Sequence, residues 1–293
     1  MVPAVSTFTP AGDLDRAAFD ANLRVHLAQG ADGVLVAGSS GESALLDDDD
    51  RRQLLTWARA AVPADRWLIA GVGSESTRQT IRRAHDAREA GADAVLVISP
   101  HYFLKRMTEP ALLAHFRAVA DASPLPVLLY NMPAYAHLVL SPAFVHAMAG
   151  HPNVVGMKDS AGNLPVLAQY LEAQGPAFRV LTGNGGTACQ ALQAGVSGAI
   201  LAIALYAGPL VHAMVAAFRA GRTDDALALQ AQLTPLATDI AGAMGPAGIK
   251  AAMELVGLSG GAPRSPLLPV SDEERAVVRA RLDAAGLLSA TTV

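Results

Sequence analysis

The sequence has a single cysteine, Cys189, among its 293 residues. A disulfide within the chain is therefore excluded, and so is a zinc site built from cysteines. Aromatic residues make up only 5% of the chain and charged residues 16%, and the net charge is −4 with no long basic run. This balance argues against a surface for nucleic acid or for an anionic membrane.

Signals for membrane insertion and export are also missing. No apolar run is long enough to span a bilayer, and the first residues, Met1 to Ala4, lack the charged region of a signal peptide. We therefore expect a cytoplasmic protein with no nucleic-acid partner and no membrane partner.

Short apolar runs alternate with amphipathic segments along most of the chain, and 52% of its residues are hydrophobic. The expected strands are residues 2–7, 33–37, 67–72, 94–98, 126–130, 154–158, 178–182 and 196–202. Expected helices include residues 15–29, 76–90, 109–121 and 208–220. Eight evenly spaced units with strands apolar throughout predict an α/β fold, the closed (β/α)8 TIM barrel. A doubly wound open sheet is the alternative, but it does not usually need eight such units.

The strand pattern stops near Gly221. Residues 223–240, 248–256 and 271–285 instead have the pattern of three helices. Because no flexible linker precedes them, we expect residues 1–222 to form a catalytic barrel and residues 223–293 to form a C-terminal helical extension packed on it.

Several conspicuous residues predict structure rather than chemistry. The acidic run Asp47–Asp50 fits the first turn of a helix better than a metal or phosphate site, because the helix dipole favours carboxylates there. Cys189 is expected to be a small packing residue. Four histidines in helical segments are expected to be structural: His85, His115, His146 and His212. No histidine cluster has metal-binding spacing.

Lys158 ends the apolar strand at residues 154–158, and Asp159 and Ser160 are expected to begin a polar turn. An ammonium is costly to desolvate on a buried strand. Burial lowers the pKa of a lysine and can leave a neutral amine that attacks a carbonyl. The alternatives are a side chain that reaches solvent at the strand end or one held in a structural ion pair.

In parallel barrels the active site forms at the carboxyl ends of the strands. The residues at these ends are Ser39–Ser40, Ser99–Tyr102, Tyr130–Asn131, Lys158–Asp159, Gly183–Asn184 and Ile200–Leu201. A lysine, two tyrosines and a pair of hydroxyls are therefore expected to face one opening. No pair of carboxylates suited to a glycosidase is evident.

Three segments carry a resemblance to a known family: Gly38-Ser39-Ser40-Gly41-Glu42, Tyr130-Asn131-Met132-Pro133 and Gly156-Met157-Lys158-Asp159-Ser160. In this order and spacing the chain resembles the dihydrodipicolinate synthase/N-acetylneuraminate lyase family of class I aldolases, over essentially its whole length. Within that family, residues 105–107, 151–160, 248–250 and 260–263 look most like 4-hydroxy-2-oxoglutarate aldolases.

The resemblance implies a catalytic role for four residues. Lys158 would form a Schiff base with pyruvate or another 2-oxo acid, which needs no separate cofactor. Tyr130 would carry protons, and Ser39 would belong to its relay. Tyr102 would come from a neighbouring subunit of a homotetramer built from dimers. Taken singly, Tyr130 could be an ordinary strand-end aromatic, and Tyr102 a loop residue at a subunit contact.

The resemblance also implies which residues contact the substrate. Ser40 would hold the carboxylate beside the ketone, although Ser39–Ser40 could merely be a helix-capping turn. The Ile200 carbonyl would face the lysine and pyruvate. Gly183 and Asn184 would line the site at the end of the seventh strand.

Two departures from the family pattern limit the substrate. Tyr135 stands where dihydrodipicolinate synthases carry an arginine, so the guanidinium for a distal carboxylate is absent. Asn184–Gly186 stand where the synthases and sialate lyases place acidic residues. A third departure does not concern the substrate: His101 replaces the first tyrosine of the family's Pro-Tyr-Tyr segment. Because Tyr102 keeps the second tyrosine, we expect the proton relay to be intact.

Together with the residue chemistry, the resemblance implies a Schiff-base aldolase or lyase that uses or releases pyruvate, with a 4-hydroxy-2-oxoglutarate-like substrate as the first choice. The enzymatic alternatives are 4-hydroxy-tetrahydrodipicolinate (dihydrodipicolinate) synthase and a 2-keto-3-deoxy sugar-acid aldolase or dehydratase. A protein that only binds 2-oxo acids is a further alternative, but simple binding would not need a proton relay.

Overall fold

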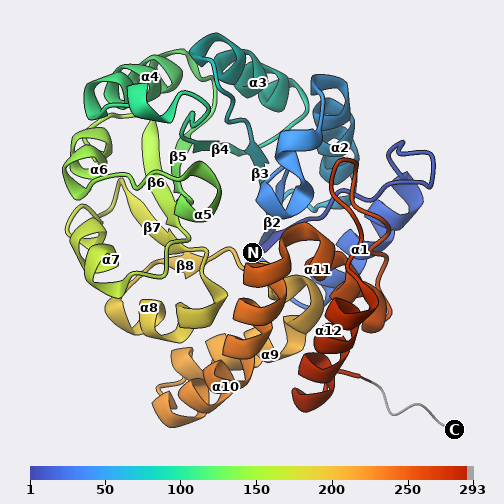
Figure 1. Ribbon diagram of the computed structural model, residues 1–293. Helices are drawn as coiled ribbons and strands as arrows, with labels where there is room; N and C mark the ends of the chain where they lie inside the picture. The colour runs from blue at the N-terminus through green and yellow to red at the C-terminus, as the bar shows by residue number, and fades with distance from the viewer. Residues whose placement is uncertain (289–293) are drawn as a thin grey trace, which may run out of the picture.

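The computed structural model describes residues 1–288. Within them, eight parallel strands form one sheet in which each strand pairs with the next in the chain (Figure 1). The strands are β1 (Val2–Pro3), β2 (Gly33–Val36), β3 (Trp67–Gly71), β4 (Ala94–Ile98), β5 (Val127–Asn131), β6 (Val154–Asp159), β7 (Arg179–Thr182) and β8 (Gly198–Ala199). Met1 N donates to Ala199 O at 3.0 Å, and Leu201 N donates to Met1 O at 3.3 Å, so the last strand returns to the first. The predicted (β/α)8 barrel is confirmed.

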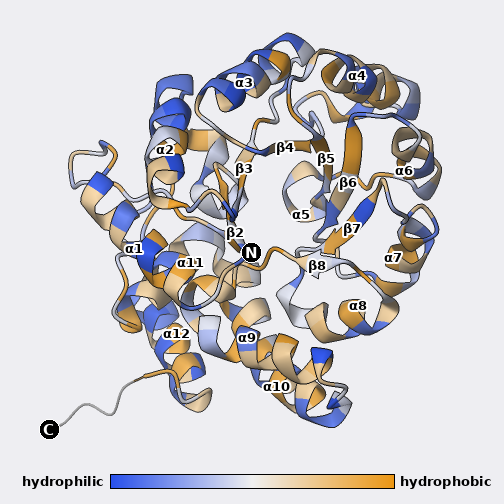
Figure 2. Cartoon of the chain, turned by 180° about the vertical axis from the view of Figure 1, so that it is seen from behind, coloured by the Kyte–Doolittle hydropathy of each residue, from blue (hydrophilic) through white to orange (hydrophobic). Residues whose placement is uncertain are grey.

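Helices surround the strands. They are α1 (Arg16–Ala28), α2 (Asp48–Ala61), α3 (Thr77–Glu89), α4 (Glu109–Ala122), α5 (Pro133–Ala136), α6 (Pro142–Ala149), α7 (Leu164–Leu171), α8 (Ala188–Ala194) and α9 (Ala204–Arg219), with the short turns η1 (Ser39–Gly41), η2 (Ser43–Leu45), η3 (Leu104–Arg106) and η4 (Gly185–Thr187). Figure 2 shows largely hydrophobic strands enclosed by helices whose hydrophilic residues lie on the outside. Helices that cover an apolar sheet in this way bury one face and leave the other to water.

The first and last strands are shorter than predicted. β1 stops at Pro3 instead of residue 7, because side-chain bonds replace the ladder there: Ser6 Oγ donates to Gly41 O at 2.7 Å. β8 covers only Gly198–Ala199 instead of 196–202, since the chain turns towards α9 at Leu201.

Strand side chains alternate between the barrel interior and the surrounding helices. The interior cluster consists of Leu35, Ile69, Ala94, Leu96, Leu128, Tyr130 and Ile200. On β6, Met157 packs in the outer core, so the next residue, Lys158, points inwards. The register of β5 with β6 pairs Tyr130 with Lys158 and therefore places the two side chains next to each other.

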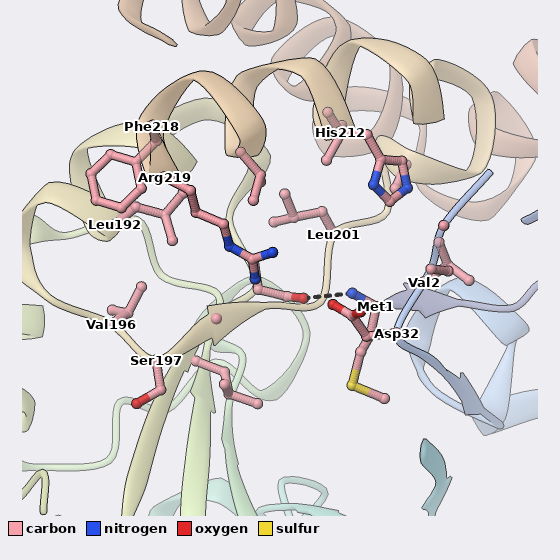
Figure 3. A pocket seen from close by; sticks show the side chains of 18 residues that line it. Met1, Val2, Asp32, Leu192, Val196, Ser197, Leu201, His212, Phe218 and Arg219 are labelled. Carbon is pink, nitrogen blue, oxygen red and sulfur yellow. Dashed lines mark hydrogen bonds between the residues drawn. The ribbon is translucent and has the colours of Figure 1, made fainter. Parts of the chain in front are cut away.

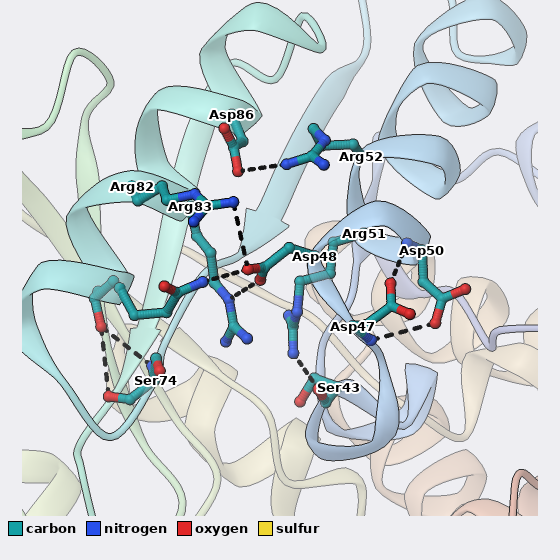
Figure 4. A network of polar contacts seen from close by, with 12 residues as sticks. Ser43, Asp47, Asp48, Asp50, Arg51, Arg52, Ser74, Arg82, Arg83 and Asp86 are labelled. Carbon is teal, nitrogen blue, oxygen red and sulfur yellow. Dashed lines mark hydrogen bonds and ion pairs between the residues drawn. The ribbon is translucent and has the colours of Figure 1, made fainter.

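The acidic run Asp47–Asp50 begins α2, as predicted. The Asp47 side chain accepts from Asp50 N at 2.8 Å, and the Asp50 side chain accepts from Asp47 N at 3.2 Å (Figure 4). Asp48 pairs with Arg83 of α3 at 2.8 Å. The run therefore caps α2 and joins it to α3.

The C-terminal part comprises α10 (Thr223–Leu236), η5 (Ala237–Gly242), α11 (Ala243–Leu255) and α12 (Asp272–Ala284). The expected break between residues 240 and 248 is not found, because the π-helical turn η5 joins α10 to α11. Gly245 adopts φ +56°, which lets the chain kink and continue through Pro246. Residues 289–293 of the expected extension lie outside the described residues.

No helix within residues 1–288 combines the length and apolar character needed to cross a membrane.

Candidate active site

A cavity of about 290 Å³ opens at the carboxyl ends of the strands. Its wall contains seven of the residues that the sequence analysis selected: Ser39, Ser40, Tyr130, Tyr135, Lys158, Gly183 and Asn184. Ile200 is instead buried in the interior cluster, and Tyr102 lies on the surface, 78% exposed. The structure therefore gathers residues from β2, β5, β6 and β7 at one opening.

Lys158 is buried in this wall, with only 5% of its surface exposed. Its Nζ donates to Tyr130 OH at 3.5 Å and lies 4.6 Å from the centre of the tyrosine ring. The side chain therefore does not extend to solvent. The other buried lysine, Lys250, is the one held in an ion pair.

Ser39 contacts the Tyr130 hydroxyl, which is also the group that Lys158 contacts. Its Oγ lies 3.4 Å from Tyr130 OH, within hydrogen-bonding distance. The turn η1 that carries Ser39 and Ser40 lies between two left-handed residues, Ala37 at φ +54° and Glu42 at φ +56°. Such strain in residues other than glycine often occurs where the chain must aim a functional group. Amine, phenol and hydroxyl thus form a continuous polar path along the cavity wall.

Gly183 makes room for the lysine. A Cβ at this position would lie 2.5 Å from Lys158 Cε and closer still to Ser160 Oγ. Its backbone N–H donates to Asp159 O at 2.6 Å. Only glycine therefore fits between the lysine and the end of β7 without displacing either.

Asp159 is the last residue of β6 rather than the start of a polar turn, which corrects the prediction. It is buried, and its Oδ1 accepts from Asn131 Nδ2 at 2.7 Å. The Asn131 Oδ1 in turn accepts from Leu140 N at 3.0 Å, and Tyr170 OH donates to Leu140 O at 2.5 Å. Burial raises the pKa of the Asp159 carboxyl, while the Asn131 bond opposes this rise. The network ties the ends of β5 and β6 together on the side opposite Tyr130 and Lys158.

A second polar cluster lies behind the Ser39–Ser40 turn and was not predicted. Glu42 Oε1 lies 2.5 Å from Lys250 Nζ, and Glu42 Oε2 accepts from Arg264 N at 2.7 Å. Burial lowers the pKa of Lys250, and Glu42 opposes this shift. The only sequence signal was the glutamate of the Gly-Ser-Ser-Gly-Glu segment, which does not reveal a partner so distant in the chain.

Tyr102 does not reach the cavity of its own chain. Its backbone N–H and that of His101 donate to Glu75 Oε2 at 2.9 and 3.0 Å. The Tyr102 ring packs edge-on against Phe103 at 5.0 Å between centroids. Glu75 therefore fixes the backbone of this loop and leaves the phenol on the surface.

The outer part of the cavity is formed by polar uncharged and small residues. Tyr135 and Asn184 lie here beside Thr238 of η5. Asn184 Oδ1 accepts from Gly186 N at 2.9 Å. Burial raises the pKa of the Tyr135 phenol, so it stays protonated near neutral pH.

The histidines singled out in the sequence all lie in helices, as predicted: His85 in α3, His115 in α4, His146 in α6 and His212 in α9. Cys189 is buried in α8. Among residues 1–288, no group of three or more histidine, cysteine, aspartate or glutamate side chains could hold a metal ion.

A larger cavity, of about 370 Å³, lies at the amino ends of the strands (Figure 3). Met1, Asp32 and Ser197 mark this end, and His212 and Arg219 of α9 lie across from them. It contains neither Lys158 nor Tyr130. The smaller cavity is therefore the candidate active site.

Comparisons with known proteins show what the chain as a whole is similar to. The model of the Dihydrodipicolinate synthetase family matches residues 1–285. A 4-hydroxy-tetrahydrodipicolinate synthase of Synechococcus sp. (strain CC9605) is 39% identical over 271 residues, which cover 92% of this chain and 89% of the relative. The crystal structure of dihydrodipicolinate synthase DapA-2 from Bacillus anthracis has a TM-score of 0.92 at 29% identity and covers 96% of both chains. YagE, a prophage protein of the dihydrodipicolinic acid synthase family from E. coli K12 solved with pyruvate, has a TM-score of 0.91 at 29% identity over 98% of this chain and 97% of its own.

Proposed function

We propose that Lys158 forms a Schiff base with pyruvate, because the chain belongs to the dihydrodipicolinate synthetase family. Members of this family are lyases of the class I aldolase type, and so is this chain. One observation carries this assignment: the buried Lys158 Nζ lies 3.5 Å from Tyr130 OH in the wall of the cavity. The pyruvate bound to the related YagE structure supports the choice of donor.

The first step is attack of the neutral Lys158 amine on the ketone carbon of pyruvate. A C=N bond replaces the C=O bond, and the ketone oxygen leaves as water with two protons from the nitrogen. Tyr130 is close enough to move these protons between nitrogen and oxygen. Ser39, 3.4 Å from the Tyr130 hydroxyl, extends the path.

The imine nitrogen then takes up a proton from the Tyr130 hydroxyl, and the second step uses this protonated imine as an electron sink. Loss of a proton from the methyl carbon gives an enamine, whose carbon attacks an aldehyde and forms the new C–C bond. The aldehyde oxygen takes up a proton, and water then hydrolyses the imine to release a 4-hydroxy-2-oxo acid. The reverse sequence cleaves such an acid and releases pyruvate.

We assign the pyruvate carboxylate to the Ser40 hydroxyl and backbone N–H. Ser40 belongs to the turn next to Tyr130, on the same wall as Lys158. We place the Ile200 carbonyl opposite the lysine. Ile200 N donates to Thr182 O at 2.9 Å, and Leu201 N, in the same peptide as the Ile200 carbonyl, donates to Met1 O at 3.3 Å, so the peptides on both sides of Ile200 are held.

The names of the relatives help to choose between the candidate reactions. The Synechococcus relative is named 4-hydroxy-tetrahydrodipicolinate synthase, which favours synthase chemistry, with aspartate semialdehyde as the acceptor, over the 4-hydroxy-2-oxoglutarate reading. Tyr135, at the position where the synthases carry arginine, argues against that acceptor. The relatives therefore favour the synthase and Tyr135 opposes it, so the proposal is the imine chemistry that all of the candidate reactions share.

We also propose that Tyr102 completes the site of a neighbouring subunit in a homotetramer. Its exposure and its fixed backbone support such a role. We treat residues 1–222 as the catalytic barrel and residues 223–293 as an extension packed on it. Gln230 supports this division, since it lies in α10 and its Nε2 donates to Gly185 O of the cavity wall at 2.9 Å.

Reduction with borohydride in the presence of pyruvate tests the assignment. The chain has three lysines, Lys105, Lys158 and Lys250, so mass spectrometry of peptides can locate the adduct without ambiguity. We expect the adduct on Lys158 and none in the Lys158→Met variant, while Lys105→Met keeps it. An adduct that survives in Lys158→Met would refute the assignment.

A further inference from the structure

We propose that Gln230 of α10 is a positioning residue of the active site, which holds the backbone of Asn184–Gly186 where this segment forms part of the cavity wall. The inference rests on the proposed function, because the wall matters for catalysis only if a substrate is bound at Lys158. It goes beyond that function, since it gives the C-terminal extension a part in shaping the space next to pyruvate.

The Gln230 amide joins α10 to this segment and to α8, which lies beside α10 (Figure 1). Gln230 is buried, with 2% of its surface exposed. Its Nε2 donates to Gly185 O at 2.9 Å and to Gly186 O at 3.1 Å. Its Oε1 accepts from Cys189 N at 2.8 Å. One amide therefore holds two carbonyls of the wall and the first turn of the helix that follows it.

Thr234 lies one turn further along α10 and contacts the same segment. Its Oγ1 is 3.1 Å from Gly186 O and accepts from Gln230 Nε2 at 3.1 Å. The single hydroxyl proton is shared between Gly186 O and Gln230 O, which lies at 2.9 Å. Thr234 therefore supports the contact that Gln230 makes but holds fewer groups of the wall.

The segment also packs tightly against its surroundings at Gly185. A Cβ at this position would lie 2.9 Å from Ile203 Cδ1 and 3.1 Å from Ala237 Cβ, so the backbone approaches η5 as closely as glycine allows. Gly185 and Ala237 both line the cavity. Without the Gln230 amide the two carbonyls would lose a donor, and the segment would have to move towards water to regain one.

The end of the segment nearest the lysine is held by other bonds. Gly183 N donates to Asp159 O at 2.6 Å, and Asn184 N donates to Thr182 Oγ1 at 3.3 Å. Both bonds lie within the barrel, and neither involves α10. Release of the two carbonyls should therefore leave Lys158 in place and displace only the wall beyond it.

The test compares borohydride trapping of pyruvate with trapping of 2-oxopentanoate, whose longer tail reaches past the space of pyruvate. Gln230→Met keeps the length of the side chain and removes its donor and its acceptor. We expect the concentration of 2-oxopentanoate that half-saturates the Lys158 adduct to rise about fivefold or more, because a small shift in a supporting wall changes the fit of a ligand that touches it. The value for pyruvate should stay within about twofold of the parent's, since the lysine keeps its geometry. A role of Gln230 in stability alone would not separate the two acids.

Two further variants complete the comparison. Gln232→Met is the matched control, because Gln232 is exposed on the same helix, and it should leave both values unchanged. Thr234→Val removes only the hydroxyl and should raise the 2-oxopentanoate value by less than Gln230→Met does. Urea unfolding shows whether each variant is folded, and if Gln230→Met is not, an unchanged 2-oxopentanoate value in Thr234→Val overturns the inference.

Other outcomes would also overturn the role of Gln230. These are an equal rise for both acids, no rise for 2-oxopentanoate, or the same effect in Gln232→Met. A parent that traps pyruvate but not 2-oxopentanoate would do so too, because the wall would then enclose no space beyond pyruvate. A parent that forms no pyruvate adduct on Lys158 contradicts the proposed function itself, so the two failures are distinguishable.

Discussion

Glu42 and Lys250 form a buried ion pair that joins the turn after β2 to helix α11. The two charged atoms lie 2.5 Å apart, and the side chains are 0% and 1% exposed. Lys250 Nζ also donates to Ala262 O at 3.0 Å. The C-terminal extension is thereby attached to the short turn that carries Ser39 and Ser40.

The pair predicts an asymmetric response to mutation. Lys250→Met leaves the Glu42 carboxylate buried without its cation, so we expect a loss of about 3–5 kcal/mol in the free energy of unfolding. The double variant Glu42→Gln/Lys250→Met removes both charges and should recover much of that loss. Urea unfolding measures both. Equal destabilisation of the single and double variants would show that the charge pairing itself contributes little.

The position of Gly183 predicts a sharp effect on catalysis. In Gly183→Ala the new Cβ would displace the Lys158 side chain, and a shift of about 1 Å in a reacting group can cost about 100-fold in rate. Gly175→Ala is the matched control, since a Cβ there meets no atom within 4 Å. The measurement is kcat for pyruvate-dependent turnover in both variants. Full activity of Gly183→Ala would mean that the lysine does not need this space.

Replacement of Tyr130 should impair proton transfer more than it impairs the binding of pyruvate. We expect Tyr130→Phe to slow turnover by about 100-fold or more, because general acid–base catalysis contributes on this scale. The borohydride adduct on Lys158 should still form in this variant, only more slowly. If turnover of Tyr130→Phe is unchanged, the tyrosine has no part in the proton path.

Two buried histidines predict that the fold weakens in acid. Burial lowers the pKa of His26 and of His115 to about 4, from an ordinary value of 6.5. As the pH falls the unfolded chain binds the proton first, so stability present above about pH 6.5 is lost towards pH 4, by about 3 kcal/mol for each histidine. In His26→Leu, urea unfolding should show a smaller loss between about pH 7 and about pH 4.5 than in the parent. His85→Leu, altered at an exposed position on α3, serves as control and should keep the full loss.

Periodicity explains why the barrel could be predicted from the sequence. Apolar strands and amphipathic helices repeat evenly, and a parallel sheet buried on both faces leaves few other arrangements. The strand ends were less predictable. β1 stops early where Ser6 Oγ donates to Gly41 O, and β8 stops early where Leu201 O accepts from Ala204 N in the turn towards α9. Such bonds leave no mark on the hydrophobic pattern.

Asp159 is a residue of the site whose place in a strand could also not be predicted from the sequence pattern. A charged residue after a strand usually starts a turn, but here the Asn131 amide satisfies the carboxylate and keeps it in β6. The asparagine belongs to the neighbouring strand, so only the packed barrel reveals the bond.

The sequence by itself determined the barrel, the seventh-strand glycine and a lysine whose burial requires a reason, because each of these follows from residue type and local order. Only the tertiary structure decided that Lys158 meets Tyr130 at 3.5 Å, that Glu42 is neutralised by Lys250, and that the outer cavity lacks charged side chains within the described residues. These facts depend on strand register and on contacts between segments far apart in the chain. Such contacts form only when burial of the apolar core brings the segments together.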